Sequence, residues 1–299
     1  MTLLELIEDG ARRFEAAGLS YGHGTTNAFD EAAWLTLWKL GLPLDTPLDD
    51  APDSQANRPL AHEDIAQTAT LFEARIASRK PAAYLTHEAW LQGVSFYVDE
   101  RAIVPRSLIA EVIADGSIDY WLTASTHRVL DLCTGNGSLA VIAALTYPET
   151  EVTGADLSPD ALAVAAINVV RHALQERITL VESDGLRADA LQARAPFDLI
   201  LCNPPYVNAQ SMAVLPAEYR AEPELALAGG TDGMDFVRTL LAEAPAVMAP
   251  GSVLVLEIGN ERRYFEAAFP TLEVVWLETS AGSDQILLIT REALLAHQA

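Results

Sequence analysis

Residues 128–137, with the sequence RVLDLCTGNG, are the most informative stretch for the fold, because a short apolar strand pattern runs directly into a glycine-rich turn. The apolar helix pattern of residues 138–147 follows at once. Glycines between a strand and a helix let the backbone approach a ligand closely. A dinucleotide site would show the spacing Gly-x-Gly-x-x-Gly, whereas this turn reads Asp-x-Cys-x-Gly-x-Gly and has no third glycine. The turn therefore predicts a ligand loop that differs from the dinucleotide type.

Strand and helix patterns alternate on both sides of this turn. Such alternation is typical of βαβ units around a parallel sheet. The last two strand patterns, 272–277 and 285–290, are joined by too short a connection for a crossover helix, so this pair should be antiparallel. The other predicted strands are 151–155, 178–182, 197–202 and 252–257, and the predicted helices are 107–122, 159–174 and 233–248.

The residues before this region have mostly helical spacing. The patterns predict helices at 3–17, 28–40 and 62–79, with Asn27 as an N-cap, a loop at 43–59 and a β-hairpin at 90–98. We therefore expect three parts: a helical domain at 1–86, a β-hairpin linker at 87–106 and an α/β domain at 107–299.

The composition is acidic and half hydrophobic. The 299 residues include 42 acidic and 19 basic side chains, a net charge of −23. A strongly negative field repels phosphate backbones and attracts basic proteins, although solubility alone would also explain it. No apolar run reaches the roughly 18 residues needed to span a bilayer, and the N-terminal pattern is not that of a signal peptide. The two cysteines, Cys133 and Cys202, have no metal-ligand spacing and suit a reducing, cytoplasmic setting.

Three acidic residues follow predicted strands. Asp156 ends the second strand, where a carboxylate can bind both hydroxyls of a ribose. Asp131 ends the first strand and is placed to attract an amine-bearing group, and Asp184 after the third strand is placed to accept a hydrogen bond from an adenine amino group. An adenosine-bearing ligand with a charged tail would use these acids, while a surface-loop acid at Asp156 and a turn acid at Asp184 are the ordinary explanations.

The stretch Asn203-Pro204-Pro205-Tyr206 follows the fourth strand. Its prolines remove two backbone donors and fix two φ angles, and each preceding residue is pushed out of the helical region. This stiff corner leaves the Asn203 and Pro204 carbonyls beside an amide and a ring, so it could hold a planar group that carries an NH2. A plain Asn-Pro turn that closes the strand is the simpler explanation.

The order of these motifs resembles that of the class I methyltransferases that use S-adenosylmethionine. More narrowly, the chain is similar over nearly its whole length to the protein N5-glutamine methyltransferases, the HemK/PrmC and PrmB group. The PrmB branch, which modifies ribosomal protein L-three, looks most similar, whereas the PrmC branch modifies peptide-chain release factors. Four segments favour PrmB: 21–25, 96–101, 104–107 and 218–224. The first of these segments could also be an ordinary turn.

The resemblance implies a Rossmann-like α/β fold, with a mostly parallel sheet and an antiparallel last strand, preceded by a helical substrate-recognition domain and a β-hairpin. It implies a methyltransferase whose catalytic residues are Asn203, Pro204 and Tyr206, with Pro205 and Arg106 also binding substrate. The family's aromatic residue after the third-strand acid is replaced by Gly185, so adenine stacking must come from elsewhere, such as Leu186. The implied residues for S-adenosylmethionine are Asp131, Cys133, Thr134, Gly135, Asn136, Gly137, Asp156, Leu157, Asp184, Gly185 and Asn203.

The chemistry to be explained is methylation of an amide nitrogen, which is a poor nucleophile. We expect the Asn203 side-chain oxygen and the Pro204 carbonyl to accept the two N–H hydrogens of a glutamine amide, with Tyr206 packed on its plane and no general base. The same motif occurs in methyltransferases of exocyclic base amines in RNA or DNA, but phosphate binding needs cationic contacts, and no rich basic patch is visible among the 19 basic residues. The motif is also compatible with a release-factor methyltransferase, and the fold with a non-catalytic ribosome assembly factor.

The two cysteines allow one more prediction. Cys133 follows the first strand and Cys202 ends the fourth, and these strands are neighbours in this fold. We therefore expect the two thiols to lie close together beneath the glycine loop, either as unrelated small core residues or with a redox role.

Overall fold

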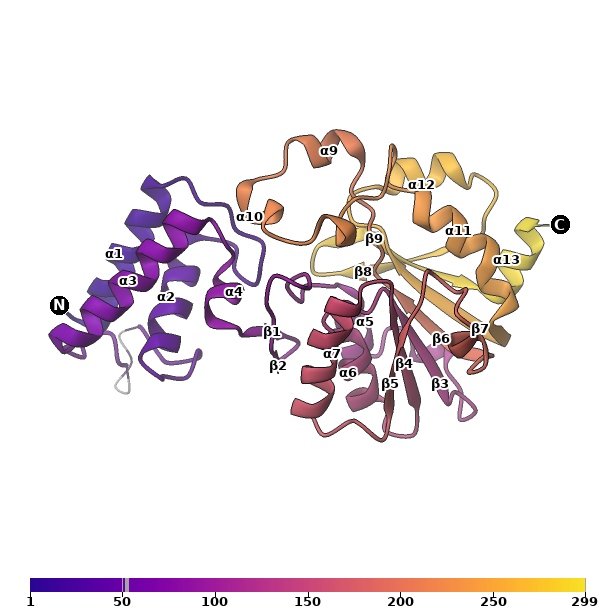
Figure 1. Cartoon of the computed structure of the whole chain (residues 1–299), viewed down its shortest axis with the longest axis horizontal. Helices are drawn as coiled ribbons and strands as arrows, with labels where there is room; N and C mark the ends of the chain where they lie inside the picture. Colours follow the sequence, from indigo (N-terminus) through magenta and orange to yellow (C-terminus); the bar gives the residue numbers. More distant parts are fainter. Residues whose placement is uncertain (50, 52–53, 299) are drawn as a thin grey trace. The chain divides into compact units, whose positions relative to one another are not determined.

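A computed structural model describes residues 1–49, 51 and 54–298, and the chain divides into two compact units. Unit 1 contains residues 1–89 and 216–222, and unit 2 contains the remainder. Figure 1 shows the chain by sequence, from the indigo N-terminal helices to the yellow C-terminal helix. The units are divided at different positions from the predicted domains 1–86, 87–106 and 107–299. The predicted hairpin linker lies with the sheet from residue 90 onward, and residues 216–222 pack with the N-terminal helices.

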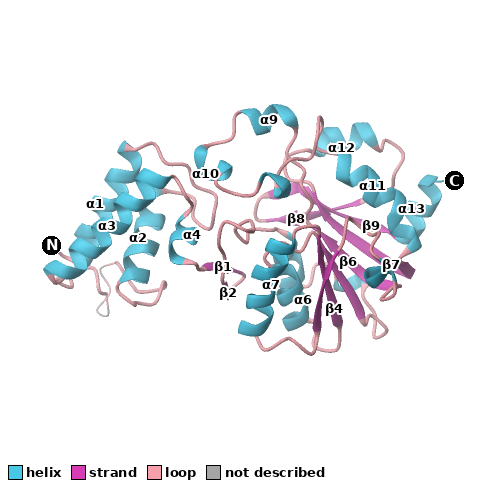
Figure 2. Ribbon diagram, in the orientation of Figure 1, coloured by secondary structure: helices cyan, strands magenta, loops and turns pink. Residues whose placement is uncertain are grey.

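Unit 2 is built on a seven-stranded sheet in the order β5-β4-β3-β6-β7-β9-β8 (Figure 2). The strands β3 to β7 are parallel, and β9 is antiparallel to both β7 and β8. This confirms the predicted parallel sheet with an antiparallel last strand. The bounds are β3 (Arg128–Leu132), β4 (Glu151–Asp156), β5 (Ile178–Glu182), β6 (Phe197–Cys202), β7 (Met248–Glu257), β8 (Val275–Thr279) and β9 (Gly282–Thr290). As predicted, residues 90–98 contain a separate two-stranded sheet, β1 (Ala89–Leu91) and β2 (Val94–Phe96).

Helices cover both faces of this sheet. Successive strand residues point to opposite faces, so Val129 packs in one apolar core and Leu130 in the other. The first core includes residues of α5 (Ile109–Ala114), α6 (Ser138–Thr146) and α7 (Pro159–Arg171). The second includes residues of α8 (Asp189–Gln192), α11 (Asp235–Glu243), α12 (Arg262–Ala268) and α13 (Arg291–Gln298). A short helix, α9 (Ala209–Ala213), lies in the connection after β6.

Three predicted helices of unit 2 are shorter than expected. The predicted helix 107–122 ends at Ala114, because Gly116 takes a left-handed φ of 74°, and a 3-10 turn, η1 (Asp119–Trp121), follows. The predicted helix 233–248 is α11 and then a 3-10 turn, η3 (Ala244–Ala246), because Pro245 cannot donate the backbone hydrogen bond of an α-helix. The predicted helix 159–174 ends at Arg171, and Ala173 is left-handed.

Unit 1 is helical, and its three longer helices begin where the sequence indicated, whereas two short helices, at 82–86 and 217–220, were not predicted. Asn27 caps α2, as predicted, by accepting a hydrogen bond from the Asp30 N–H at 2.9 Å. The rings of Phe14 and Phe72 meet edge to face, with centroids 5.3 Å apart, in the core between the helices. The predicted loop 43–59 has no helix among its described residues, and residues 50, 52 and 53 lie outside them. The helices are α1 (Leu3–Ala16), α2 (Ala28–Lys39), α3 (His62–Ser78), α4 (Ala82–Thr86) and α10 (Ala217–Arg220).

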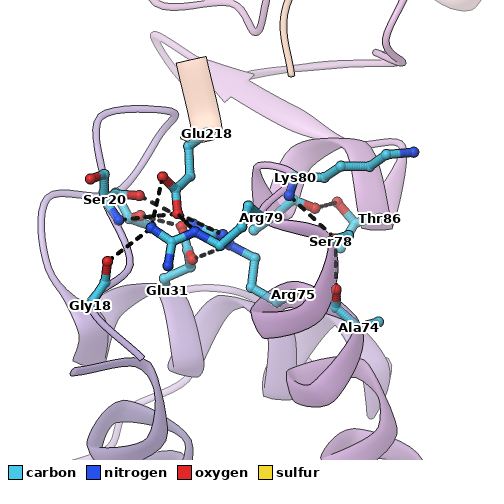
Figure 3. A network of polar contacts seen from close by, with 12 residues as sticks. Gly18, Ser20, Glu31, Ala74, Arg75, Ser78, Arg79, Lys80, Thr86 and Glu218 are labelled. Atoms are coloured by element: carbon cyan, nitrogen blue, oxygen red, sulfur yellow. Dashed lines mark hydrogen bonds and ion pairs between the residues drawn. The ribbon is translucent and has the colours of Figure 1, made fainter. Parts of the chain in front are cut away.

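A buried ion network holds α10 among the helices of unit 1 (Figure 3). Arg75 of α3 is fully buried and donates from Nε to Glu31 of α2 at 2.7 Å and from Nη1 to Glu218 of α10 at 3.3 Å. Arg79 also pairs with Glu218, at 2.9 Å. Buried charges are tolerated only when they are paired and hydrogen-bonded. The segment 216–222 is therefore attached to unit 1 by charge as well as by packing.

The segment 21–25 packs against the same part of unit 1. His23 is 1% exposed, its Nε2 lies 3.4 Å from the Glu222 carboxylate, and its ring centroid is 4.3 Å from that of Tyr219. A Cβ atom at Gly22 would lie 2.3 Å from the Tyr219 hydroxyl. These contacts support a structural role for this segment. Among the described residues of both units, no helix is long and apolar enough to cross a membrane.

Candidate active site

Parallel strands end together at one edge of the sheet in unit 2. Leu132 at the end of β3 pairs with Ala155 of β4 and with Cys202 of β6, and Asp156 of β4 pairs with Glu182 of β5. From β3 the chain goes first to β4 on one side and later to β6 on the other. Ligands of open α/β sheets bind outside the carboxyl ends of the strands at such a switch point.

A pocket opens at this edge, and eight predicted site residues line it. The rest of the lining comes from the strand ends, from the start of α7, from residues of the 101–103 and 223–226 segments and from Phe236 of α11. Arg101 and Pro223 belong to the segments 96–101 and 218–224 that carry the family resemblance, whereas no local motif in the sequence marks Ala102, Ile103, Leu225 and Ala226. The predicted residues in the lining are Cys133, Gly135, Asp156, Leu157, Asp184, Gly185, Asn203 and Pro205.

Four more of the predicted cofactor residues shape the glycine loop: Asp131, Thr134, Asn136 and Gly137. Asp131 is fully buried, and its Oδ2 accepts hydrogen bonds from the Thr134 hydroxyl at 2.5 Å and the Ala140 N–H at 2.9 Å. Burial raises the pKa of Asp131 to about 7. Asn136 is buried as well, and a Cβ at Gly137 would lie 3.0 Å from that of Ala165 on α7. These contacts shape the loop, and direct contact of Asp131 with a cofactor stays a prediction.

Asp156 ties the glycine loop to the end of β4. Its Oδ2 accepts from the Gly135 N–H at 2.8 Å, and its Oδ1 accepts from the Ser158 N–H at 2.9 Å. Burial raises the pKa of this carboxyl, against the effect of these two hydrogen bonds. Each oxygen keeps a further lone pair that a ligand hydroxyl on the pocket side can use.

Asn168 of α7 joins the glycine loop to the segment after β2, a role that no sequence pattern indicated. Its side chain accepts from the Tyr97 N–H at 2.7 Å and donates to the Tyr97 and Asn136 carbonyls at 2.9 and 2.8 Å. Asn136 in turn donates to the Ile103 carbonyl at 2.7 Å. One amide thus connects the glycine loop to the segment that continues into the pocket lining. A single Asn inside an amphipathic helix has no distinguishing signal in the sequence.

The third-strand end of the pocket has an aromatic wall. Asp184 and Gly185 line this end together with Phe236. The Asp184 side chain is exposed and pairs with Arg187 at 3.2 Å. The expectation that Leu186 supplies the stacking surface is wrong, because Leu186 is 2% exposed and packs in the core of the sheet.

Two of the four residues of the predicted catalytic motif line the pocket, and the other two do not. Asn203 and Pro205 line the pocket, whereas Pro204 is buried. The Tyr206 ring turns toward the end of β7, where its hydroxyl donates to Glu257 at 3.3 Å. It lies against Gly259, at which an added Cβ would come within 2.5 Å of the ring.

Glu257 also brings in the segment of Arg106. Its second carboxylate oxygen accepts from the Ser107 hydroxyl at 2.5 Å and the Leu108 N–H at 3.0 Å. Burial raises the pKa of Glu257, while these donors, the Arg106 charge and the Tyr206 hydroxyl oppose that rise. The sequence identified Arg106 and Tyr206 but not the acid that connects their segments, because Glu257 is an isolated acid at a strand end.

The predicted proximity of the two thiols is confirmed. Burial raises the pKa of the Cys202 thiol, and its contact with the Cys133 thiol raises that pKa further. Cys133 takes a left-handed φ of 60° as the chain leaves β3 and lines the pocket. Both are free cysteines.

The fold and the family model agree on the class of protein. The model of the methyltransferase small domain matches residues 119–218. Among solved structures, the hMettl16 catalytic domain in complex with MAT2A 3'UTR hairpin 6 superimposes with a TM-score of 0.51 and 14% identity, over 76% of this chain and 81% of that chain. At this identity the likeness concerns the fold alone. The chain is a class I methyltransferase.

Curated relatives identify the family. The ribosomal protein uL3 glutamine methyltransferase of Bordetella pertussis is 51% identical over 98% of this chain and 96% of its own length. The protein of the same name from Burkholderia pseudomallei is 50% identical over 99% of this chain and 96% of its own length. That from Neisseria meningitidis serogroup A is 45% identical over 99% and 95%. The chain belongs to the family of ribosomal protein uL3 glutamine methyltransferases.

Proposed function

We propose that this protein transfers a methyl group from S-adenosylmethionine to the side-chain amide nitrogen of a glutamine in ribosomal protein uL3. The observation that carries the proposal is the position of Asn203 and Pro205 in the same pocket as Asp156 and Gly135. An amide-binding corner and a ribose-binding carboxylate thus face one cavity. The names of the relatives supply the substrate, and work on a ribosomal protein suits a cytoplasmic enzyme.

The pocket residues fit S-adenosylmethionine. Asp156 offers a carboxylate whose two oxygens are oriented by backbone N–H groups, as a pair of ribose hydroxyls requires. Phe236 offers a flat apolar wall beside Asp184, as an adenine with its amino group requires. The glycine loop, whose Gly135 N–H donates to Asp156, brings backbone close to the side of the ribose position away from the adenine, where the methionine part would lie. We assign these three elements to ribose, adenine and methionine.

When bound, the cofactor supplies an electrophilic methyl group. The protein's own part is to orient the acceptor and to stabilise developing charge. The Asn203 side-chain oxygen and the Pro204 carbonyl accept the two amide N–H hydrogens, which directs the nitrogen lone pair into the pocket. Pro205 keeps the corner rigid, Tyr206 packs beside the amide plane, and the proton leaves to water.

The overall charge favours a basic protein as the substrate. A net charge of −23 steers a basic ribosomal protein toward the enzyme and opposes the approach of nucleic acid. Labelled S-adenosylmethionine offered separately to purified uL3, to release factor and to ribosomal RNA tests this. We expect label on a uL3 glutamine. Label on release factor alone would move the enzyme to the sister branch, and label on RNA alone would overturn the proposal.

The role of Asn203 has its own test. Asn203→Ala removes one of the two amide acceptors, so turnover on uL3 should fall by about 10³-fold, the size of the loss when a preorganised hydrogen bond in a catalytic site is removed. The affinity for S-adenosylhomocysteine, measured by calorimetry, should stay within a few-fold of the wild type. Turnover equal to that of the wild type would exclude this role for Asn203.

A further inference from the structure

Glu257 joins two parts of the active site that are far apart in the sequence. Its Oε1 accepts from the Tyr206 hydroxyl, 51 residues away, at 3.3 Å. Its Oε2 accepts from the Ser107 hydroxyl and the Leu108 N–H, 150 and 149 residues away. The side chain belongs to a residue that is 4% exposed. One buried carboxylate thus receives three donors, two from the residues just before α5 and one from the catalytic motif.

This arrangement goes beyond what packing requires. A buried carboxylate is costly unless it is well hydrogen-bonded, and an apolar side chain of similar size would fill the same space at lower cost. The Tyr206 ring is also held from a second direction, because the backbone of Gly259, with φ of 53°, leaves no room for a Cβ beside it. The hydroxyl contact and the Gly259 contact together restrict the position of the ring.

We propose that Glu257 is a positioning residue for methyl transfer, which holds the Tyr206 ring and the Arg106–Ser107 turn in place before the acceptor amide arrives. This inference rests on the proposed function, since it assumes that Tyr206 packs beside that amide. Glu257 acts through Tyr206, which directly follows the pocket residue Pro205 in the chain, and neither Glu257 nor Tyr206 is part of the pocket lining. It preorganises the acceptor side of the site, as Asp156 orders the cofactor side.

Glu257→Gln separates the contact with Tyr206 from the contacts near α5. The Leu108 N–H requires an acceptor, so the remaining side-chain oxygen stays on Ser107 and Leu108. The new NH2 group then faces Tyr206, so the hydroxyl loses the charged acceptor to which it donated and meets a neutral donor in its place. The variant keeps the volume and the hydrogen bonds near α5 and changes only the contact with the tyrosine. Tyr206→Phe removes the same contact from the tyrosine side and keeps the ring.

Turnover with uL3 should fall about tenfold in Glu257→Gln and in Tyr206→Phe, while the affinity for S-adenosylhomocysteine stays within about twofold in both. The double variant should be no slower than the slower single variant, because both remove one interaction. Tyr147→Phe is a matched control, since the Tyr147 hydroxyl donates to Asp119 at 2.9 Å outside the pocket lining. Its turnover should equal that of the wild type.

A readout that does not depend on the substrate completes the test. Amide hydrogen exchange at residues 206–208 should be faster in Glu257→Gln than in the wild type and unchanged in Tyr147→Phe. Unchanged exchange, wild-type turnover of Glu257→Gln, or losses that multiply in the double variant would overturn the inference. A wild-type enzyme that labels release factor in place of uL3 would overturn the proposed substrate, and the same variants would then be compared on release factor.

Discussion

Asp131 shows how a single buried acid can organise a loop. It is fully buried, one oxygen accepts from Thr134 and Ala140, and its second oxygen has no hydrogen-bond partner among the described protein atoms. Burial raises the pKa of this carboxyl to about 7. The folded protein therefore favours the protonated acid at mildly acidic pH, where an unfolded aspartate is ionised.

This pKa sets the sign of a pH dependence. Because the folded pKa lies above the unfolded value, the stabilisation from Asp131 is complete below about pH 4 and is lost as the pH rises to about 7. Its slope is at most about 1.4 kcal/mol of unfolding free energy per pH unit. Asp131→Asn removes the titration. The unfolding free energy of the wild type minus that of the variant, measured by urea unfolding, should therefore decrease as the pH rises from about 4 to about 7. Parallel pH profiles would contradict the prediction.

Phe236 supplies the residue-scale test of the cofactor site. Phe236→Ala removes the aromatic wall beside Asp184 and Gly185, and the affinity for S-adenosylhomocysteine should fall about tenfold, as the loss of one ring stack and its apolar contact implies. Phe236→Tyr keeps the ring and should stay within about threefold. Calorimetry on both variants measures this, and equal affinities of the alanine and tyrosine variants would exclude stacking.

At the scale of elements, α10 depends on its ion network. A helix of four residues is not stable by itself, so Arg75 and Arg79 must hold it through Glu218, with Arg75 itself paired to Glu31. This explains why the segment 216–222 belongs to unit 1 although its neighbours in the sequence lie in unit 2.

Removal of the central arginine should release this element. Arg75→Ala leaves Glu31 and Glu218 buried without their shared partner, which costs about 3–5 kcal/mol. We expect a lower melting temperature and faster tryptic cleavage after Arg220. Arg12→Ala, which removes an exposed pair with Asp9 at 3.3 Å, is the control and should change stability by less than about 1 kcal/mol. Equal cleavage rates in the two variants would show that α10 is held by different contacts.

At the scale of the whole molecule, charge should control the encounter with the substrate. The 42 acidic residues exceed the 19 basic ones by 23, and salt screens such a field over about 8 Å at physiological ionic strength. The value of kcat/KM with uL3 should therefore fall several-fold between about 50 and 300 mM salt. Cofactor affinity measured at the same salt concentrations is the control. A salt-independent kcat/KM would mean that steering is unimportant.

The parallel and antiparallel strands, the glycine loop and the rigid corner at 203–206 were all predictable from the amino-acid sequence, while the catalytic role of that corner stays a prediction. These features are local: proline fixes φ at Pro204 and Pro205, glycine permits the left-handed turn at Gly135, and period-two apolar runs predict buried strands. The position of Asp156 at the end of the second strand also followed, because parallel strands present their carboxyl ends at one edge. Helix ends were less predictable, since Gly116 and Pro245 stop helices whose apolar periodicity continues.

Which distant side chains meet depends on the tertiary fold. Strand order and register bring Glu257 to Tyr206 and Ser107, and they place Phe236 beside Gly185 and bury Leu186 in the core. Packing likewise assigned α10 to the helical unit and put Asp131 beneath the glycine loop. These contacts join residues that are mostly far apart in the sequence, and their free energy depends on burial and hydrogen-bond geometry. No local pattern in the sequence contains either quantity.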